Sequence, residues 1–343
     1  MFRKLMLLPP AALVLYRMAE KGHTTKIDGE QAIYEMRKVP INDTKLAVMI
    51  RGKDRRNPVL LCVTGGPCGT DIPIIKKYEK ELEEHFTIVH YDQRGAGKSL
   101  EFLKDYSKLT ADVHVNDLLA LTAYICYYLN QEKVYILGHS YGTYLASQAV
   151  HKDSLYYKAY IGIGQMSDMV KAEMESVDAC IEAAKEAGNK KDVKALEKVR
   201  PKVEKGDAIC PRKYVRKYKF AEREETHAGR DFMMNVMTGP EYNITDGIKF
   251  FYGAMRYAYP LAMQAMKKPL TDIVKSYPIP AFFLMGKYDH MTSIGAAKDY
   301  YDSLGGEEPK EFIVFENSAH SPHVEENKKF TEWMCTDLLE KTK

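Results

Sequence analysis

VYILGHSYGTYLASQAV, residues 134–150, is the stretch that decides the fold. Its first four residues are apolar and two of them are β-branched, which predicts a short buried strand. The turn GHSYG follows, with Ser140 at its centre, and residues 143–150 then have the composition of a helix. On such a strand–turn–helix junction a serine hydroxyl is held out of the sheet, and the helix N-terminus directs free N–H groups toward any oxyanion. The pattern therefore predicts a nucleophile at Ser140.

Alternating strand and helix patterns surround this stretch and predict an α/β fold. Apolar runs of strand length are found at residues 31–39, 45–50, 59–64, 86–91, 159–163, 281–285 and 311–315, and helical spacing is found at 75–84, 110–129, 295–304 and 323–339. Because parallel strands need long crossover connections, this alternation indicates a mostly parallel sheet covered by helices on both faces. Asn42 and Asp43 predict a hairpin between the first two strands.

The alternation stops between residues 164 and 276, where the sequence is helical throughout. The amphipathic segments 168–186, 192–204 and 245–267 predict an all-helical cap, inserted after the sixth strand, over the strand ends where open α/β sheets bind ligands. We therefore expect an N-terminal apolar segment at 1–24, a core formed by 25–164 and 276–343, and a cap at 165–275. Residues 250–259 are expected to be ordinary cap core, with pocket lining as the alternative.

Composition narrows the function classes. The 50 basic residues are balanced by 47 acidic ones, a net charge of +3, so nothing indicates nucleic-acid binding. The six cysteines form no C-x-x-C pair and no metal-ligand spacing, which is typical of buried thiols in a reducing compartment. We therefore expect no metal and no organic cofactor, and favour a cytoplasmic location. No oligomeric state is predicted.

The first twenty residues allow a second location. Arg3 and Lys4 precede an apolar run at 5–16, which is too short to span a bilayer and contains Pro9 and Pro10. We expect a helix from about Pro9 that lies on the protein or on a membrane surface, which would give membrane contact through residues 1–20. An uncleaved anchor or signal, with a membrane-tethered protein, is the alternative.

A serine nucleophile needs a base, and the base needs an orienting carboxylate. Asp289 is the first acid after the strand 281–285, and His320 follows the strand 311–315 in a loop of small residues. His323 is the alternative base, but it is expected to begin the last helix. For the oxyanion hole we expect the backbone N–H groups of Tyr141 and of Gly66, in the glycine-rich turn after the third strand.

Four motifs together resemble the proline iminopeptidase (prolyl aminopeptidase) branch of the α/β-hydrolase superfamily: TGGPCG at 64–69, YDQRGAGKS at 91–99, GHSYG at 138–142 and GKYD at 286–289. The resemblance covers residues 26–164 and 276–343 and implies an α/β-hydrolase fold with a helical cap. It also implies that the loop at Gly66 supplies the oxyanion hole and that Asp92 and Arg94 hold neighbouring loops. Thr64 and Cys68 depart from the family's H-G-G-P-G motif.

The resemblance implies hydrolysis of short peptides that begin with proline or another small apolar residue. In the family, carboxylates of the cap hold the substrate's amino terminus, and no single carboxylate here matches that role; the acidic residues on hand are Glu173, Glu175, Asp178, Glu222, Glu224 and Glu225. Cys68, Gln165 and Glu173 are the candidate pocket residues. An esterase or amidase of small apolar acyl substrates is the second reading, and a catalytically silent binding protein is the third.

Overall fold

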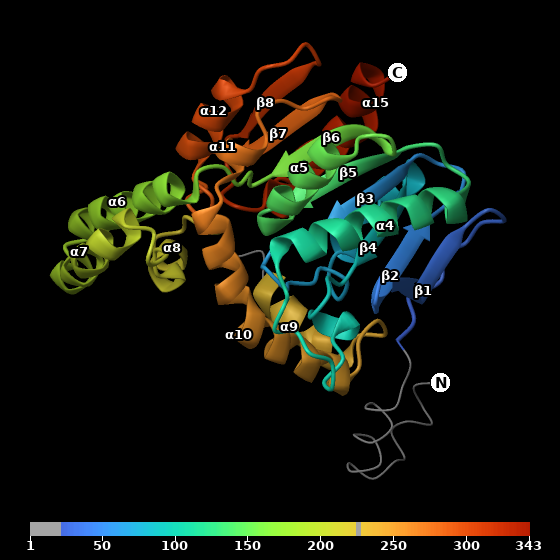
Figure 1. Cartoon of the computed structure of the whole chain (residues 1–343), viewed down its shortest axis with the longest axis horizontal. Helices are drawn as coiled ribbons and strands as arrows, with labels where there is room; N and C mark the ends of the chain where they lie inside the picture. Colours follow the sequence, from blue (N-terminus) through green and yellow to red (C-terminus); the bar gives the residue numbers. More distant parts are fainter. Residues whose placement is uncertain (1–21, 224–227) are drawn as a thin grey trace, which may run out of the picture.

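The computed structural model describes residues 22–223 and 228–343, and these form one eight-stranded sheet with helices on both faces (Figure 1). The strand order is β1-β2-β4-β3-β5-β6-β7-β8. Strands β1 (Ile33–Ile41) and β2 (Thr44–Gly52) form the predicted hairpin, and β2 also pairs antiparallel with β4 (Thr87–Tyr91). All remaining pairs, from β4 to β8 along this order, are parallel. The strands that they add are β3 (Val59–Val63), β5 (Val134–His139), β6 (Tyr157–Ile163), β7 (Ala281–Gly286) and β8 (Lys310–Phe315).

The alternation of side chains along the central strands separates two cores, one on each face of the sheet. On one face Leu61 and Ile136 pack with side chains of α4 (Ala111–Leu129) and α5 (Tyr141–Lys152). On the other face Leu60 and Leu137 pack with Phe330 and neighbouring residues of the last helical segment. A sheet buried on both faces explains why its central strands read as continuous apolar runs.

The helices between β6 and β7 form the predicted insertion. They are α6 (Met169–Glu186), α7 (Lys190–Glu204), α8 (Arg212–Lys217), α9 (Ala228–Thr238), α10 (Ile244–Lys267) and α11 (Leu270–Ile273). Figure 1 shows α6 to α8 projecting at one side of the sheet, while α9 and α10 lie below its strand ends. The mostly parallel sheet and this insertion confirm the predicted fold class. The exact domain boundaries stay predictions.

Two predicted helices are interrupted. The segment 75–84 forms the short α3 (Lys76–Glu79) and a separate 3-10 turn, η1 (Leu82–Glu84). The last segment is broken at Glu326, between α13 (Pro322–Glu325) and α14 (Asn327–Trp333); it continues as the π-helical η3 (Met334–Leu338) and α15 (Leu339–Lys341). The helix α12 (Ile294–Ser303) follows β7 as expected.

The predicted N-terminal helix lies outside the described residues. Within residues 22–223 and 228–343, no helix combines the length and the apolar character needed to cross a membrane.

Candidate active site

Ser140 occupies the turn between β5 and α5 in a backbone conformation that side chains rarely adopt, with φ 54° and ψ −122°. Close packing enforces the turn: a methyl group at Gly142 would lie 1.8 Å from the carbonyl oxygen of Val63. The Ser140 N–H donates to the Ile163 carbonyl at 2.9 Å, which fixes the turn against the end of β6. The sequence thus folds locally into the junction that its glycine spacing predicts.

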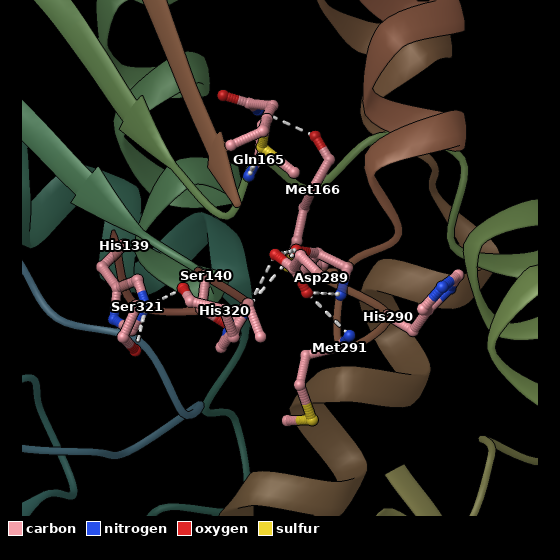
Figure 2. A network of polar contacts seen from close by, with 12 residues as sticks. His139, Ser140, Gln165, Met166, Asp289, His290, Met291, His320 and Ser321 are labelled. Carbon is pink, nitrogen blue, oxygen red and sulfur yellow. Dashed lines mark hydrogen bonds and ion pairs between the residues drawn. The ribbon is translucent and has the colours of Figure 1, made fainter. Parts of the chain in front are cut away.

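Asp289 and His320 meet in the loops that follow β7 and β8. His320 Nδ1 lies 2.9 Å from Asp289 Oδ2, so the ring presents its Nδ1–H to the carboxylate (Figure 2). Asp289 is fully buried, and it accepts further bonds from the Thr292 hydroxyl (2.9 Å) and the Met291 N–H (2.8 Å). Burial raises the pKa of Asp289, but His320 and these hydrogen bonds outweigh burial and hold the pKa below its ordinary value.

The His320 ring lies beside the end of β6, to which the Ser140 turn is also bonded. A methyl group at Gly164, the residue after β6, would lie 2.8 Å from the His320 Cε1 atom. Since Ser140 donates to the adjacent Ile163, the two predicted partners share neighbours at this point of the sheet edge. No hydrogen bond to the Ser140 hydroxyl forms within the described chain, which is common for catalytic pairs before substrate binds.

A cavity of about 360 Å³ opens over Ser140. Gly66 and Tyr141, the predicted oxyanion residues, both line it. A methyl group on the neighbouring Gly65 would lie 2.9 Å from the Ser140 Cβ, so the glycine-rich loop packs directly on the serine turn. The structure therefore brings both predicted backbone donors to the wall of the cavity that Ser140 faces.

Gln93, which the sequence analysis did not assign, ties this loop to the core. Its side-chain amide donates to the Thr64 carbonyl at 2.7 Å, and its carbonyl oxygen accepts from the Cys68 N–H at 3.4 Å. Asp92 and Arg94 were expected to hold neighbouring loops, and Arg94 does pair with Asp43 in the turn between β1 and β2, while Asp92 accepts from the Tyr242 hydroxyl of the cap. Arg94 forms a paired contact with Asp117, and Asp92 accepts the Lys98 N–H at 2.7 Å. The position of Gln93 inside the YDQRGAGKS motif at 91–99 was the sequence feature from which its role could have been predicted.

The three candidate pocket residues do not line this cavity. Cys68 is buried, and burial raises the pKa of its thiol to about 12, so it is a packed thiol. Gln165 is buried and accepts from the Tyr160 hydroxyl at 2.6 Å. Glu173 is buried in an ion pair with Arg212 and accepts the Cys210 N–H at 2.8 Å.

The other described cap carboxylates that were candidates also have partners within the protein. Glu175 accepts from the Ser293 hydroxyl and Asp178 pairs with Arg200, while Glu222 has a partner of its own. Glu224 and Glu225 lie outside the described residues. The described residues that line the cavity are apolar, hydroxyl-bearing or basic and include no carboxylate: Gly66, Pro67, Ser140, Tyr141, Met166, Met169, Ile209, Arg212, Arg216, Ala254, Ala258, Tyr259, Ala262, Met291 and Thr292.

The segment 250–259 divides between two roles. Ala254, Ala258 and Tyr259 line the cavity, so the alternative of pocket lining describes part of it. Phe251, Tyr252 and Met255 are instead exposed, which the expectation of ordinary cap core missed.

His139 and His323 lie behind the candidate site. The His139 ring contacts the rings of His320 and His323, at 4.9 and 4.7 Å between centroids, and its Nε2 atom lies 3.1 Å from the His320 carbonyl. Burial, and then the proximity of His320, lower the pKa of His139 to about 4, so its ring is neutral near pH 7. His323, the alternative base, is half-buried against Phe330 and forms no hydrogen bond with Asp289 in the described chain.

Cys62, Glu79 and His90 are grouped closely enough to offer three ligand atoms to a metal ion, all within 4.8 Å of one another. In the structure His90 Nε2 contacts both Glu79 oxygens at 2.9 Å instead. This buried trio lies on β3, α3 and β4 and lines no part of the cavity over Ser140.

Comparison with known proteins agrees with this architecture. A family model described as alpha/beta hydrolase fold matches residues 58–327. The probable aminopeptidase YbaC of Bacillus subtilis (strain 168) is 29% identical over 311 residues, which cover 88% of this chain and 95% of that protein. A proline iminopeptidase of Saccharolobus solfataricus is 23% identical over 333 residues, 92% of this chain and 94% of the relative.

Among solved structures, the proline iminopeptidase of Mycobacterium smegmatis superposes with a TM-score of 0.63 at 16% identity, over 90% of this chain and 99% of that one. These relatives confirm the resemblance to proline iminopeptidases that the four motifs indicated. Because the family model matches more than half of its length, the chain belongs to the α/β hydrolase fold family.

Proposed function

We propose that this protein is a serine hydrolase in which Ser140 is the nucleophile, His320 the general base and Asp289 the residue that orients the base. The supporting observation is that His320 donates Nδ1–H to the buried Asp289 while its ring lies beside the end of β6, to which the Ser140 turn is bonded. With Nδ1 engaged, Nε2 is the nitrogen left to take a proton.

The reaction follows from these roles. His320 Nε2 takes the Ser140 proton as the serine oxygen attacks the substrate carbonyl carbon, and the N–H groups of Gly66 and Tyr141 stabilise the oxyanion. His320 then gives the proton to the leaving amine or alcohol, and the acyl-enzyme forms. Water attacks the acyl-enzyme with His320 again as base, and Ser140 regains its proton.

The first substrate class that we propose is a short peptide cleaved at its amino terminus. Support comes from the names of the relatives, which include an aminopeptidase and proline iminopeptidases. The cavity volume and its alanine and methionine walls suit a small apolar side chain.

A specific observation favours a second candidate, an esterase or amidase of small apolar acyl groups. A free substrate amine needs a carboxylate partner, whereas the charged groups among the described cavity residues are Arg212 and Arg216. Glu173, the carboxylate next to Arg212, is already neutralised by it.

An activity-based probe tests the shared chemistry. A fluorophosphonate should label the wild-type protein and Ser154→Ala, which removes a half-buried serine hydroxyl away from the cavity, but should not label Ser140→Ala. Absence of labelling in folded wild-type protein, or equal labelling of Ser140→Ala, would contradict the proposal and favour a binding protein.

The substrate classes are separated by turnover of matched chromogenic compounds. An aminopeptidase should hydrolyse proline and alanine arylamides with a free amine and should lose activity when the amine is acetylated. Hydrolysis of p-nitrophenyl acyl esters alone, or of the acetylated arylamides equally well, would exclude the aminopeptidase and leave the esterase or amidase.

A further inference from the structure

Helix α10 presents an apolar face to solvent. Its opposite side is seated tightly, because Gly253 is buried and a methyl group there would lie 2.2 Å from the Gly95 carbonyl oxygen. Along the outer side, large apolar residues recur at intervals of three and four, which places them on one face. Their exposed fractions lie between 38% and 80%: Ile248, Phe251, Tyr252, Met255 and Tyr259.

The loop after β4 extends this surface. The Phe102 ring lies 5.8 Å from the Tyr252 ring in an edge-on contact, and the adjacent Leu103 is fully exposed. We call the five helix residues together with Phe102 and Leu103 the α10 face. An exposed apolar surface of this extent is uncommon in monomeric soluble proteins and usually marks an interaction site.

The charge around the α10 face is positive. Asp246 is the single acidic residue in the α10 sequence, and it is buried in an ion pair with Lys98. Lys249 and Arg256 lie on the same helix and form no ion pair with another described residue. The loop residues 101–108 contribute two carboxylates and two ammonium groups, so they add no net charge and the charge around the α10 face stays positive. A helix with exposed aromatic residues, flanking cations and no exposed acid has the composition of an interfacial helix.

The described chain begins next to this helix. The His23 N–H donates to the Pro240 carbonyl at 2.9 Å, on the loop that leads from α9 into α10. The sequence before it contains the apolar run 5–16, with Arg3 and Lys4 on one side and Arg17 on the other. Twelve apolar residues are too few to span a bilayer, but their composition and flanking charges suit adsorption to its surface. The sequence that contains this run therefore joins the described structure beside the loop that leads into α10.

We propose that the α10 face docks on an anionic lipid surface. The positive charge selects an anionic bilayer over a neutral one, and the apolar residues supply the attraction at contact. Because Tyr259 belongs to the α10 face and also lines the cavity over Ser140, docking would bring the mouth of the candidate active site to the lipid. The docking itself does not depend on the proposed hydrolysis.

Vesicle co-sedimentation of the full chain tests this proposal. The wild type should bind vesicles that contain phosphatidylglycerol in preference to pure phosphatidylcholine. The double substitution Phe251→Asp with Met255→Asp should weaken that binding about tenfold or more, because it removes two apolar contacts and adds two negative charges. The matched control is Tyr127→Asp with Leu155→Asp, two residues that are 88% and 64% exposed outside the α10 face, and it should bind like the wild type.

Circular dichroism melting of each variant separates loss of docking from loss of folding. A second pair, Lys249→Glu with Arg256→Glu, should abolish the preference for phosphatidylglycerol while leaving the melting temperature unchanged.

Three results would overturn the proposal. Binding that disappears on deletion of residues 1–21 but is unaffected by the aspartate pair would assign docking to the N-terminal segment alone. Binding that appears only after that deletion would mean that the segment covers the α10 face. A dimer that the aspartate pair dissociates, in wild-type protein that binds no vesicles, would make a second copy the occupant.

Discussion

Asp289 contacts the His320 ring through one hydrogen bond. Its Oδ2 atom receives the His320 Nδ1–H, while the Thr292 hydroxyl and the Met291 N–H hold the carboxylate in place. Thr292 also lies 3.5 Å from His320 Nδ1, so it contacts both partners. Sequence analysis did not assign Thr292, although its position three residues after the acid, in a turn that the carboxylate caps, was a usable signal.

Replacement of Asp289 by asparagine should reduce kcat by about 10³-fold or more, because the amide favours the wrong imidazole tautomer. KM should change little, since Asp289 does not line the cavity. Steady-state kinetics on whichever chromogenic substrate is active measures both constants. A loss of less than tenfold would contradict the assigned role.

The same substitution should make the free energy of unfolding depend less on pH in the acid range. Because the pKa of Asp289 is depressed in the folded protein, its stabilising contribution is present above the ordinary value of 3.8 and is lost as pH falls through the lower folded value. Urea unfolding of both proteins between about pH 5 and pH 2 should show the wild type losing more stability than Asp289→Asn.

The elements that carry the candidate site are strand ends and the loops after them. The sequence indicated all of these, because strand spacing and glycine motifs are local signals. It failed where side chains from distant elements interrupt a helix. Glu326 breaks the last helix because its carboxylate accepts from Asn317 and Ser318 in the loop that carries His320. In the segment 75–84, Glu79 is bonded to His90, and Glu83 to Arg51.

Glu173, one of the candidate pocket residues, does not line the cavity for a related reason. A charged residue on the inner side of a cap helix can face the cavity or another buried charge, and helical periodicity does not distinguish these two cases. Glu173 faces Arg212, so the residue that reaches the cavity is the arginine. Only the packing of α6 against α8 decides that outcome.

At the scale of a loop, Gln93 is a positioning residue for the Gly66 turn. The substitution Gln93→Leu keeps the volume but removes the bonds to the Thr64 carbonyl and the Cys68 N–H. We expect kcat to fall by about 10- to 100-fold, because the oxyanion donor moves, with a smaller change in KM. Gln93→Glu retains the acceptor for Cys68 and should recover part of the activity. If the two variants lost the same fraction of kcat and were destabilised to the same extent, Gln93 would have a purely structural role.

Across the whole molecule, α10 joins the cap to the core. Asp246 at its first turn pairs with the buried Lys98 of the core, and Tyr242, just before the helix, donates to Asp92. Both contacts lie beside the loop that carries Gln93, so the cap is fixed to the same loop system that shapes the candidate oxyanion hole.

Asp246→Asn should destabilise the protein by about 3–5 kcal/mol, because it leaves the Lys98 ammonium buried without its partner. The double variant Lys98→Met with Asp246→Asn should recover part of this loss, since no uncompensated charge remains. The matched control is Asp302→Asn, which breaks the exposed pair with Lys298 and should cost less than about 0.5 kcal/mol. Urea unfolding measures all three, and equal effects of Asp246→Asn and Asp302→Asn would refute a cap-fixing role.

The backbone at Ser140 has a consequence for how such a protein can change over generations. At φ 54° and ψ −122° a residue with a side chain is disfavoured by about 1–3 kcal/mol, whereas glycine adopts this conformation readily. Ser140→Gly should therefore melt at a higher temperature than Ser140→Ala, although neither should react. Where selection for activity is absent, stability would favour replacement of the proposed nucleophile by glycine. Inactive descendants with the same fold would then be more stable than the active ones.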